Sequence, residues 1–140
     1  MSSSSAPQPV FDPTAPCSMV LMGASGDLAR RMVVPALFRL SRRGILPPGF
    51  RLIGYARDRW DDAQFREVMR EAVSKDSRPG DAEAWPAFAA GMSYVPPEVN
   101  GDDEKGYAWI GEQLARNDAE AGTGGRHLFY LAVPPAAGIR

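Results

Sequence analysis

The sequence predicts an α/β fold in which a doubly wound, mostly parallel β-sheet has helices on both faces. Two observations support this. Short apolar segments of the strand type alternate along the chain with longer segments whose apolar residues recur at helical spacing. The strand segments are nearly continuous apolar runs, as is typical of parallel strands buried on both faces. With 140 residues and no internal repeat, the chain is long enough for one domain with a substantial core.

Two strand–helix pairs are predicted in the first half of the chain. Residues 17–22, CSMVLM, form the first strand, and a helix follows over residues 27–43. Pro35 lies within this helix and predicts a kink or a restart, because proline has no N–H to donate. Residues 51–57 form the second strand and 60–73 the second helix, with Asp61 or Asp62 as its N-cap. The apolar faces comprise Leu28, Met32, Leu37, Phe38 and Leu40 in the first helix and Phe65, Val68, Met69 and Val73 in the second.

The second half continues the alternation of helix and strand. A short helix over 82–90 precedes a weak strand over 92–95, and a third long helix over 104–117 has an apolar face of Tyr107, Ile110, Gly111 and Leu114. The last strand is RHLFYLAV, residues 126–133. His127 begins this strand, and we interpret it as a surface or strand-edge residue. We interpret Trp60, Trp85 and Trp109 as packing residues.

Composition excludes several function classes. Apolar residues make up 44% of the chain, charged residues 24%, and the net charge is −1, which gives no general attraction to nucleic acid or to an anionic membrane. Cys17 and His127 are the only residues of their types, so neither an intramolecular disulfide nor a Cys/His zinc cluster can form. Without a membrane-length apolar run or a secretory signal pattern, we expect a cytoplasmic protein. The Ser/Pro-rich residues 1–16 are expected to be a flexible tail, with one domain over 17–140.

Gly23 and Gly26 lie between the first strand and the first helix, in GASGDLARR. A sharp strand-to-helix turn needs a residue without a Cβ, and a diphosphate approaches a backbone closely only where side chains are absent. The helix N-terminus would attract the phosphates. The spacing is G-x-x-G-x-x-A, with Ala29 where the usual fingerprint has its third glycine. We therefore predict a Rossmann-like dinucleotide-binding domain; alternatively, the glycines only form a tight turn.

The end of the second strand bears on the choice of coenzyme. An acid near this point would bind the adenosine ribose of NAD, whereas an arginine can accept the 2′-phosphate of NADP. The sequence has Arg57 here, which favours NADP; the alternative is a solvated arginine. Asp58 would repel the phosphate unless it points away or pairs with Arg59, so NAD stays possible.

Three segments together resemble the N-terminal part of the glucose-6-phosphate dehydrogenase family. They are GASGDLARRMVVPALFRLSRRGILPP, LIGYARDRW and RHLFYLAVPP, in this order. The resemblance covers residues 18–135. Because Asp27, Leu28 and Pro35 belong to the same pattern as the glycines, it is more specific than a glycine pair alone.

This resemblance implies the NADP-dependent oxidation of glucose 6-phosphate to 6-phosphogluconolactone in the pentose phosphate pathway. Arg57 would bind the 2′-phosphate, and Val133 and Pro134 would lie against the nicotinamide half of the coenzyme. Pro135 either follows a cis bond or only ends the strand. The coenzyme phosphates would be held by the turn residues Gly23, Ala24, Ser25, Gly26, Asp27, Leu28, Ala29 and Arg30.

The resemblance places the catalytic residues outside this chain. The family's histidine and aspartate lie in R-I-D-H-Y-L-G-K and a substrate-contacting lysine in E-K-P-F-G, and neither motif occurs here. The large β+α domain that binds substrate and forms the homo-oligomer is not recognised either, and AAGIR follows the two prolines where the family has an aromatic residue. Asp27 makes a poor base, because the helix dipole favours its charged form. We therefore expect an apparently truncated coenzyme domain that does not catalyse alone and exposes an edge strand and apolar surface.

Two other function classes stay open. A non-catalytic NADP-binding or interaction module would share the glycine turn and Arg57. A different NADP-dependent enzyme of the same fold would need a catalytic Tyr-x-x-x-Lys pair or an equivalent base. No tyrosine has a lysine four residues later, at Tyr55, Tyr94, Tyr107 or Tyr130.

Overall fold

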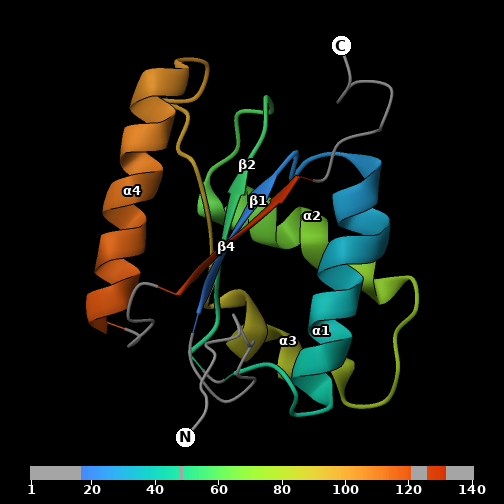
Figure 1. Ribbon diagram of the computed structural model, residues 1–140. Helices are drawn as coiled ribbons and strands as arrows, with labels where there is room; N and C mark the ends of the chain where they lie inside the picture. Colours follow the sequence, from blue (N-terminus) through green and yellow to red (C-terminus); the bar gives the residue numbers. More distant parts are fainter. Residues whose placement is uncertain (1–16, 48, 121–125, 132–140) are drawn as a thin grey trace, which may run out of the picture.

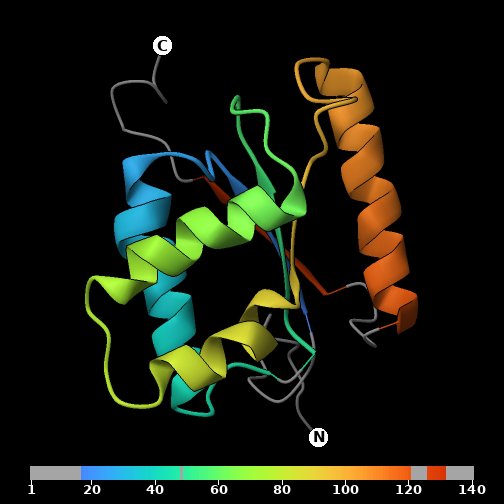
Figure 2. The same cartoon turned by 180° about the vertical axis from the view of Figure 1, so that it is seen from behind.

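The computed structural model describes residues 17–47, 49–120 and 126–131. Within them, four parallel strands form one sheet in the order β3 (Met92–Tyr94), β2 (Arg51–Tyr55), β1 (Ser18–Met22) and β4 (His127–Leu131). One face of the sheet is covered by α1 (Val34–Arg42), α2 (Asp62–Ser74) and α3 (Asp81–Ala89), and the other by α4 (Asp103–Glu120) (Figures 1 and 2). The predicted doubly wound α/β fold is confirmed.

The order of the strands reverses at β1. From β1 the chain moves outward through β2 to β3, then returns through α4 to β4 on the other side of β1. The strands are parallel, so β1 and β2 end level with each other, with Met22 opposite Tyr55. Ligands of open α/β sheets bind at such a reversal, beyond the carboxyl ends of the strands. The glycine turn that follows β1 therefore stands where this fold places its ligand.

Two hydrophobic cores lie on opposite faces of the sheet. Successive residues of a strand point to opposite faces, and the fully buried Val20 and Leu21 accordingly belong to different cores. Leu21 packs with residues of α1, α2 and α3, whereas Val20 packs with Ile110 and Leu114 of α4. The three tryptophans pack in or against these cores, as predicted, at Trp60, Trp85 and Trp109.

The first helix is interrupted where the proline predicts it. Residues Ala29–Val33, named η1, form a π-helical segment, and the N–H of Val34 donates to the carbonyl of Ala29, five residues back. Pro35 comes next and has no N–H for the ordinary helical bond. The π segment changes the side-chain spacing, so Met32 is 62% exposed rather than buried as predicted. The buried face of α1 consists of Val34, Leu37 and Phe38.

Helices α1 and α3 are joined by a buried carboxylate. Asp81, at the start of α3, accepts hydrogen bonds from the guanidinium groups of Arg39 and Arg42 and from the backbone N–H of Arg78. These hydrogen bonds, led by that from Arg39, hold the pKa of Asp81 at about 2 although burial alone would raise it. We refer to Arg39, Arg42 and Asp81 as the α1–α3 ion cluster.

The buried face of α4 differs in part from the predicted one. Ile110 and Leu114 are buried as expected, but Tyr107 is 54% exposed and Gly111 is exposed. The other buried positions are Gly106 and Asn117. The amide of Asn117 donates to the hydroxyl of Ser18 at 3.1 Å, so this end of α4 is fixed to β1 by a buried polar pair that the apolar pattern does not reveal.

Two glycines of α4 are expected to respond oppositely to alanine. A Cβ at Gly106 would lie 2.8 Å from the hydroxyl oxygen of Tyr55, whose burial and hydrogen bond to Asp103 raise its pKa to about 12. A Cβ at Gly111 would meet nothing within 4 Å. Gly106→Ala should therefore destabilise the fold by about 1–3 kcal/mol through overpacking, whereas Gly111→Ala should stabilise it by about 1 kcal/mol through helix propensity. Urea denaturation of both variants checks this pair, and a stabilising Gly106→Ala would contradict the packing.

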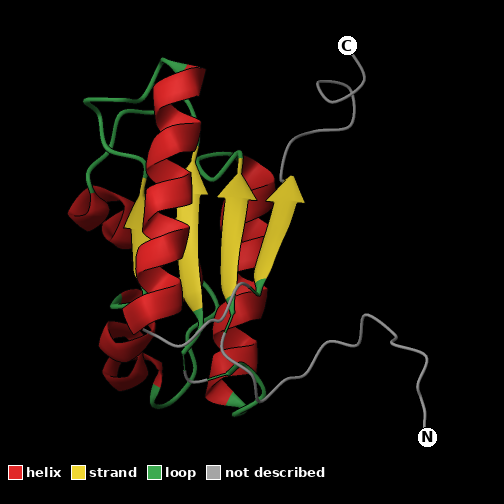
Figure 3. Cartoon of the chain, turned by 60° about the vertical axis from the view of Figure 1, so that its left-hand side comes forward, coloured by secondary structure: helices red, strands yellow, loops and turns green. Residues whose placement is uncertain are grey.

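Strand β4 lies at one edge of the sheet and exposes apolar side chains. Figure 3 shows it beside β1, at the edge of the sheet opposite β3, and in this view α4 passes in front of β3 and β2. Phe129 and Leu131 are 67% and 64% exposed. The predicted apolar edge strand is thus present within the described residues. None of the described helices is long and apolar enough to cross a membrane.

Candidate coenzyme site

The glycine turn is held against the end of β2 by main-chain bonds. The N–H groups of Gly23 and Ala24 both donate to the carbonyl of Tyr55, at 2.8 and 3.2 Å. Within the turn, the N–H of Gly26 donates to the carbonyl of Gly23 at 3.0 Å. Gly23 has φ = 78°, a left-handed conformation that favours glycine, so the predicted need for a residue without a Cβ is met there. Gly26 does not have a positive φ.

Gly54 makes room for the turn. A Cβ at this position of β2 would lie 3.0 Å from the Cβ of Ala24 and 2.7 Å from the ring of Phe65. Ala24 is fully buried as a result, and α2 approaches β2 closely through Phe65. An isolated glycine inside a strand pattern often marks such a close approach, so the position of Gly54 within RLIGYAR already indicated close packing at this point of the strand.

The turn presents backbone donors at the start of the first helix. The first helical bond is donated by the N–H of Arg30 to the carbonyl of Gly26 at 3.1 Å. The N–H groups of Asp27, Leu28 and Ala29 precede it and have no partner within the helix. Ala29 is fully buried in the core, in keeping with the predicted helix packing on the strand. Free amides, a left-handed glycine and a helix N-terminus fit a diphosphate group.

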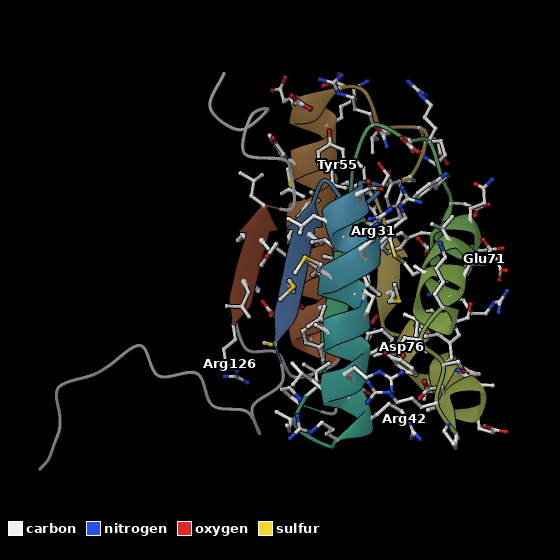
Figure 4. The ribbon with its side chains drawn as sticks, turned by 90° about the vertical axis from the view of Figure 1, so that its right-hand side faces the viewer. Arg31, Arg42, Tyr55, Glu71, Asp76 and Arg126 are labelled. Atoms are coloured by element: carbon white, nitrogen blue, oxygen red, sulfur yellow. The ribbon has the colours of Figure 1, made fainter. Side chains whose placement is uncertain are left out.

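Asp27 and Arg30 pair with each other at the mouth of the turn. The guanidinium of Arg30 donates to the carboxylate of Asp27 at 3.0 Å, and both side chains are substantially exposed. Asp27 therefore lies at the helix N-terminus as predicted, but its carboxylate binds a side chain rather than capping the backbone. In Figure 4, Arg31 and Tyr55 lie towards the end to which the strands point, and Arg126 lies at the opposite end. Arg30 and Arg31 both belong to η1, the helical segment that begins beside the turn.

The loop after β2 is fixed by two buried residues. Strand β2 ends at Tyr55, so Arg57 lies in this loop rather than in the strand as predicted. The hydroxyl of Tyr94 donates to the carbonyl of Asp58 at 2.7 Å, and the amide of Asn100 donates to the carbonyls of Ala56 and Asp58 at 2.9 and 3.1 Å. Burial raises the pKa of Tyr94 further above its ordinary value, which disfavours loss of the donated proton. Neither residue was predicted as part of the site, because their contacts join distant segments.

The two charged residues of this loop differ in their surroundings. Asp58 accepts a hydrogen bond from the hydroxyl of Ser25, at 3.3 Å, so its carboxylate faces the glycine turn. Arg57 is exposed and makes no hydrogen bond or ion pair with any part of the chain that the structure describes. Arg59 donates to the carbonyl of Pro97 at 3.1 Å. The turn, Arg57 and Asp58 thus lie together, as predicted, at the ends of β1 and β2.

The remaining predicted positions fall elsewhere. Val133, Pro134 and Pro135 lie outside the described residues. His127 begins β4, and its Nε2 lies 3.2 Å from the carboxylate of Asp118 near the end of α4. It is therefore at the amino end of the strands, far along the sheet from the glycine turn, which fits the predicted strand-edge role.

The fold, the strand reversal at β1 and the glycine turn together define a Rossmann-like domain of the dinucleotide-binding class. Comparison with known proteins agrees. The chain matches the family model described as "Glucose-6-phosphate dehydrogenase, NAD binding domain" over residues 20–138. It belongs to this family.

Relatives and solved structures give the same assignment. The chain is 46% identical over 121 residues to glucose-6-phosphate 1-dehydrogenase 2 of Mycobacterium tuberculosis, covering 86% of this chain and 23% of that protein. It is 36% identical over 129 residues to the Chlamydia muridarum enzyme, with 91% and 25% covered. A solved glucose-6-phosphate dehydrogenase in complex with glucose 6-phosphate superposes with a TM-score of 0.73 at 30% identity, over 91% of this chain and 26% of that one. The structure of glucose-6-phosphate 1-dehydrogenase from Mycobacterium avium superposes with a TM-score of 0.67 at 32% identity. This match covers 89% of this chain and 24% of that one. The chain thus spans about a quarter of the length of these relatives.

Proposed function

We propose that this chain is the coenzyme-binding part of a glucose-6-phosphate dehydrogenase that oxidises glucose 6-phosphate to 6-phosphogluconolactone with NADP⁺. The observation that carries the proposal is the glycine turn, whose main chain is fixed to the end of β2 and whose helix begins with free N–H groups. Family membership supplies the reaction, since the matched relatives carry this enzyme's name. Bound NADP⁺ supplies the acceptor for the hydride removed from C1 of the sugar.

Each predicted site residue has a role in this proposal. The turn from Gly23 to Arg30 holds the coenzyme diphosphate with its backbone donors and helix N-terminus. Arg57 binds the 2′-phosphate, because its guanidinium is exposed at the end of β2 and has no competing partner among the described residues. Val133 and Pro134, in the segment after β4, lie against the nicotinamide half. In this arrangement the chain binds and orients the coenzyme, and the proton acceptor for the sugar hydroxyl comes from outside the described site.

The proposed setting of the enzyme rests on its family resemblance and on the name of one relative. A relative from Arabidopsis thaliana, 34% identical over 125 residues, is named as cytoplasmic. We place this protein in the cytoplasm, in the pentose phosphate pathway, and as part of a homo-oligomer whose contacts are formed by the family's substrate domain. A non-catalytic NADP-binding module remains the second candidate, since the turn and Arg57 serve both.

Calorimetric titration of the folded chain with NADP⁺ and NAD⁺ tests the proposal. Arg57→Ala should weaken NADP⁺ binding by roughly 1.5–3 kcal/mol, the value of a hydrogen bond to a charged group, and should leave NAD⁺ binding nearly unchanged. Arg43→Ala, at the end of α1 away from the glycine turn, is a matched control that removes the same charge from an exposed position. Equal losses for both coenzymes in Arg57→Ala would reject its role in binding the 2′-phosphate. Failure of the folded wild-type chain to bind either coenzyme would reject the function.

An assay with glucose 6-phosphate and NADP⁺ separates binding from catalysis. We expect no NADPH from this chain alone, because the described site contains no general base for the sugar hydroxyl. The side chains nearest the turn are Asp27, paired with Arg30, and Asp58, bonded to Ser25. Turnover comparable to that of a complete enzyme would contradict this expectation and would place a base within the chain.

A further inference from the structure

We propose that Asp58 is a specificity-determining residue of this site, which accepts the adenosine ribose hydroxyls of NAD⁺ and gives the chain dual coenzyme use. This inference rests on the coenzyme site proposed above and concerns the adenosine end of it. In this arrangement Arg57 favours one coenzyme and Asp58 favours the other. Arg57 attracts the 2′-phosphate that only NADP⁺ carries, and Asp58 binds the free 2′-hydroxyl that only NAD⁺ carries.

The first support is the direction of the Asp58 carboxylate. Its Oδ1 lies 3.3 Å from the hydroxyl of Ser25, a residue of the glycine turn that is 33 positions away in the sequence. The carboxylate therefore stands between the end of β2 and the phosphate turn. In this fold an acid at that place accepts the ribose hydroxyls. The Ser25 hydroxyl shows that the carboxylate already receives a hydroxyl donor from the turn side.

The second support is that Asp58 cannot easily move away. Its carbonyl accepts from the hydroxyl of Tyr94 and from the amide of Asn100, at 2.7 and 3.1 Å. Tyr94 and Asn100 are both buried, so the backbone position of Asp58 is set by the core rather than by the solvent. A 2′-phosphate that arrives at Arg57 therefore meets a carboxylate held close by.

The third support is the lack of a neutralising partner. Asp58 could avoid repelling the 2′-phosphate in two ways: its carboxylate could point away, or it could pair with Arg59. The guanidinium of Arg59 instead donates to the carbonyl of Pro97 and lies over Gly101, where a Cβ would be 2.9 Å from it. None of the ion pairs recorded among the described residues includes Asp58. Its negative charge therefore remains to disfavour the 2′-phosphate and to favour a hydroxyl.

Binding measurements on the 140-residue chain test the inference. Asp58→Asn keeps the size of the side chain and removes its charge. We expect this variant to bind NADP⁺ about tenfold more tightly and NAD⁺ about tenfold more weakly than the wild type. The ratio of the two dissociation constants should then shift by about a hundredfold. The matched control is Glu98→Gln, which removes the same charge from the exposed loop after β3 and should leave the ratio unchanged.

The outcomes distinguish the inference from the function on which it rests. A shift of the ratio in Asp58→Asn alone supports the role of Asp58. A ratio within twofold of wild type, with both coenzymes still bound, overturns that role and leaves the coenzyme site intact. An equal shift in Glu98→Gln also overturns it, because general charge would then explain the effect. If the folded wild-type chain binds neither coenzyme, the proposed function itself fails. Thermal unfolding of each variant confirms that it is folded.

Discussion

Replacing Gly54 with valine is expected to destabilise the fold by about 3 kcal/mol or more, because the new side chain must displace three neighbours. A Cβ at Gly54 would lie 2.7 Å from the ring of Phe65 and 3.0 Å from both Ala24 and the ring of Tyr94. All three neighbours are buried, so none can move aside into solvent. Urea denaturation followed by circular dichroism gives the free energy of unfolding.

A second glycine in the same chain provides the control. Gly111→Val places the same side chain on α4, where a Cβ meets nothing within 4 Å, and should change stability by at most about 0.5 kcal/mol. Because Ala24 belongs to the glycine turn, Gly54→Val should also weaken coenzyme binding under conditions in which the variant is still folded. Wild-type stability in Gly54→Val would show that β2, Ala24 and α2 are not packed as described.

Acid should weaken the α1–α3 ion cluster within a defined pH window. The pKa of Asp81 is lowered to about 2, first by its hydrogen bond from Arg39, whereas the unfolded value is near 3.8. A depressed pKa in the folded state means that the carboxylate stabilises the fold fully above about pH 4. This contribution is lost as the pH falls through 4 towards 2. Asp81→Asn should therefore lower the unfolding midpoint by several degrees at pH 7, and the difference from wild type should shrink towards pH 2.

A neighbouring acid shows whether the effect belongs to the cluster. Asp76 pairs with Arg78 at 3.3 Å, but both side chains are largely exposed, so Asp76→Asn should keep the wild-type midpoint and pH profile. Thermal unfolding followed by circular dichroism from pH 2 to 7 measures all three proteins. A constant difference between Asp81→Asn and wild type across this range would show that Asp81 acts through its shape and not through its charge.

The sequence predicts the elements well because their patterns are local. Apolar runs, helical spacing, the cap at Asp61 and the interruption at Pro35 all depend on residues close in the chain. Asp61 forms the expected cap, together with a reciprocal bond from Gln64. The errors have local causes too. Met32 is exposed because the π segment shifts the spacing before Pro35.

The site is only partly predictable from the sequence, since some of the residues that hold its loops in place come from distant segments of the chain. The glycine turn and Arg57 are visible as motifs. The roles of Tyr94 and Asn100 depend on where the chain returns after β3, which no spacing reveals. The same holds for the ion cluster, in which residues about forty positions apart meet. Burial patterns cannot find such contacts, because each partner on its own resembles an ordinary polar residue.

One main-chain oxygen has a consequence for protein engineering. The Tyr55 carbonyl accepts hydrogen bonds from the N–H groups of both Gly23 and Ala24, so it holds the glycine turn against the end of β2. No side-chain replacement can delete a carbonyl. Substitutions at residues 57–59 that are designed for either coenzyme should therefore leave the position of the glycine turn unchanged.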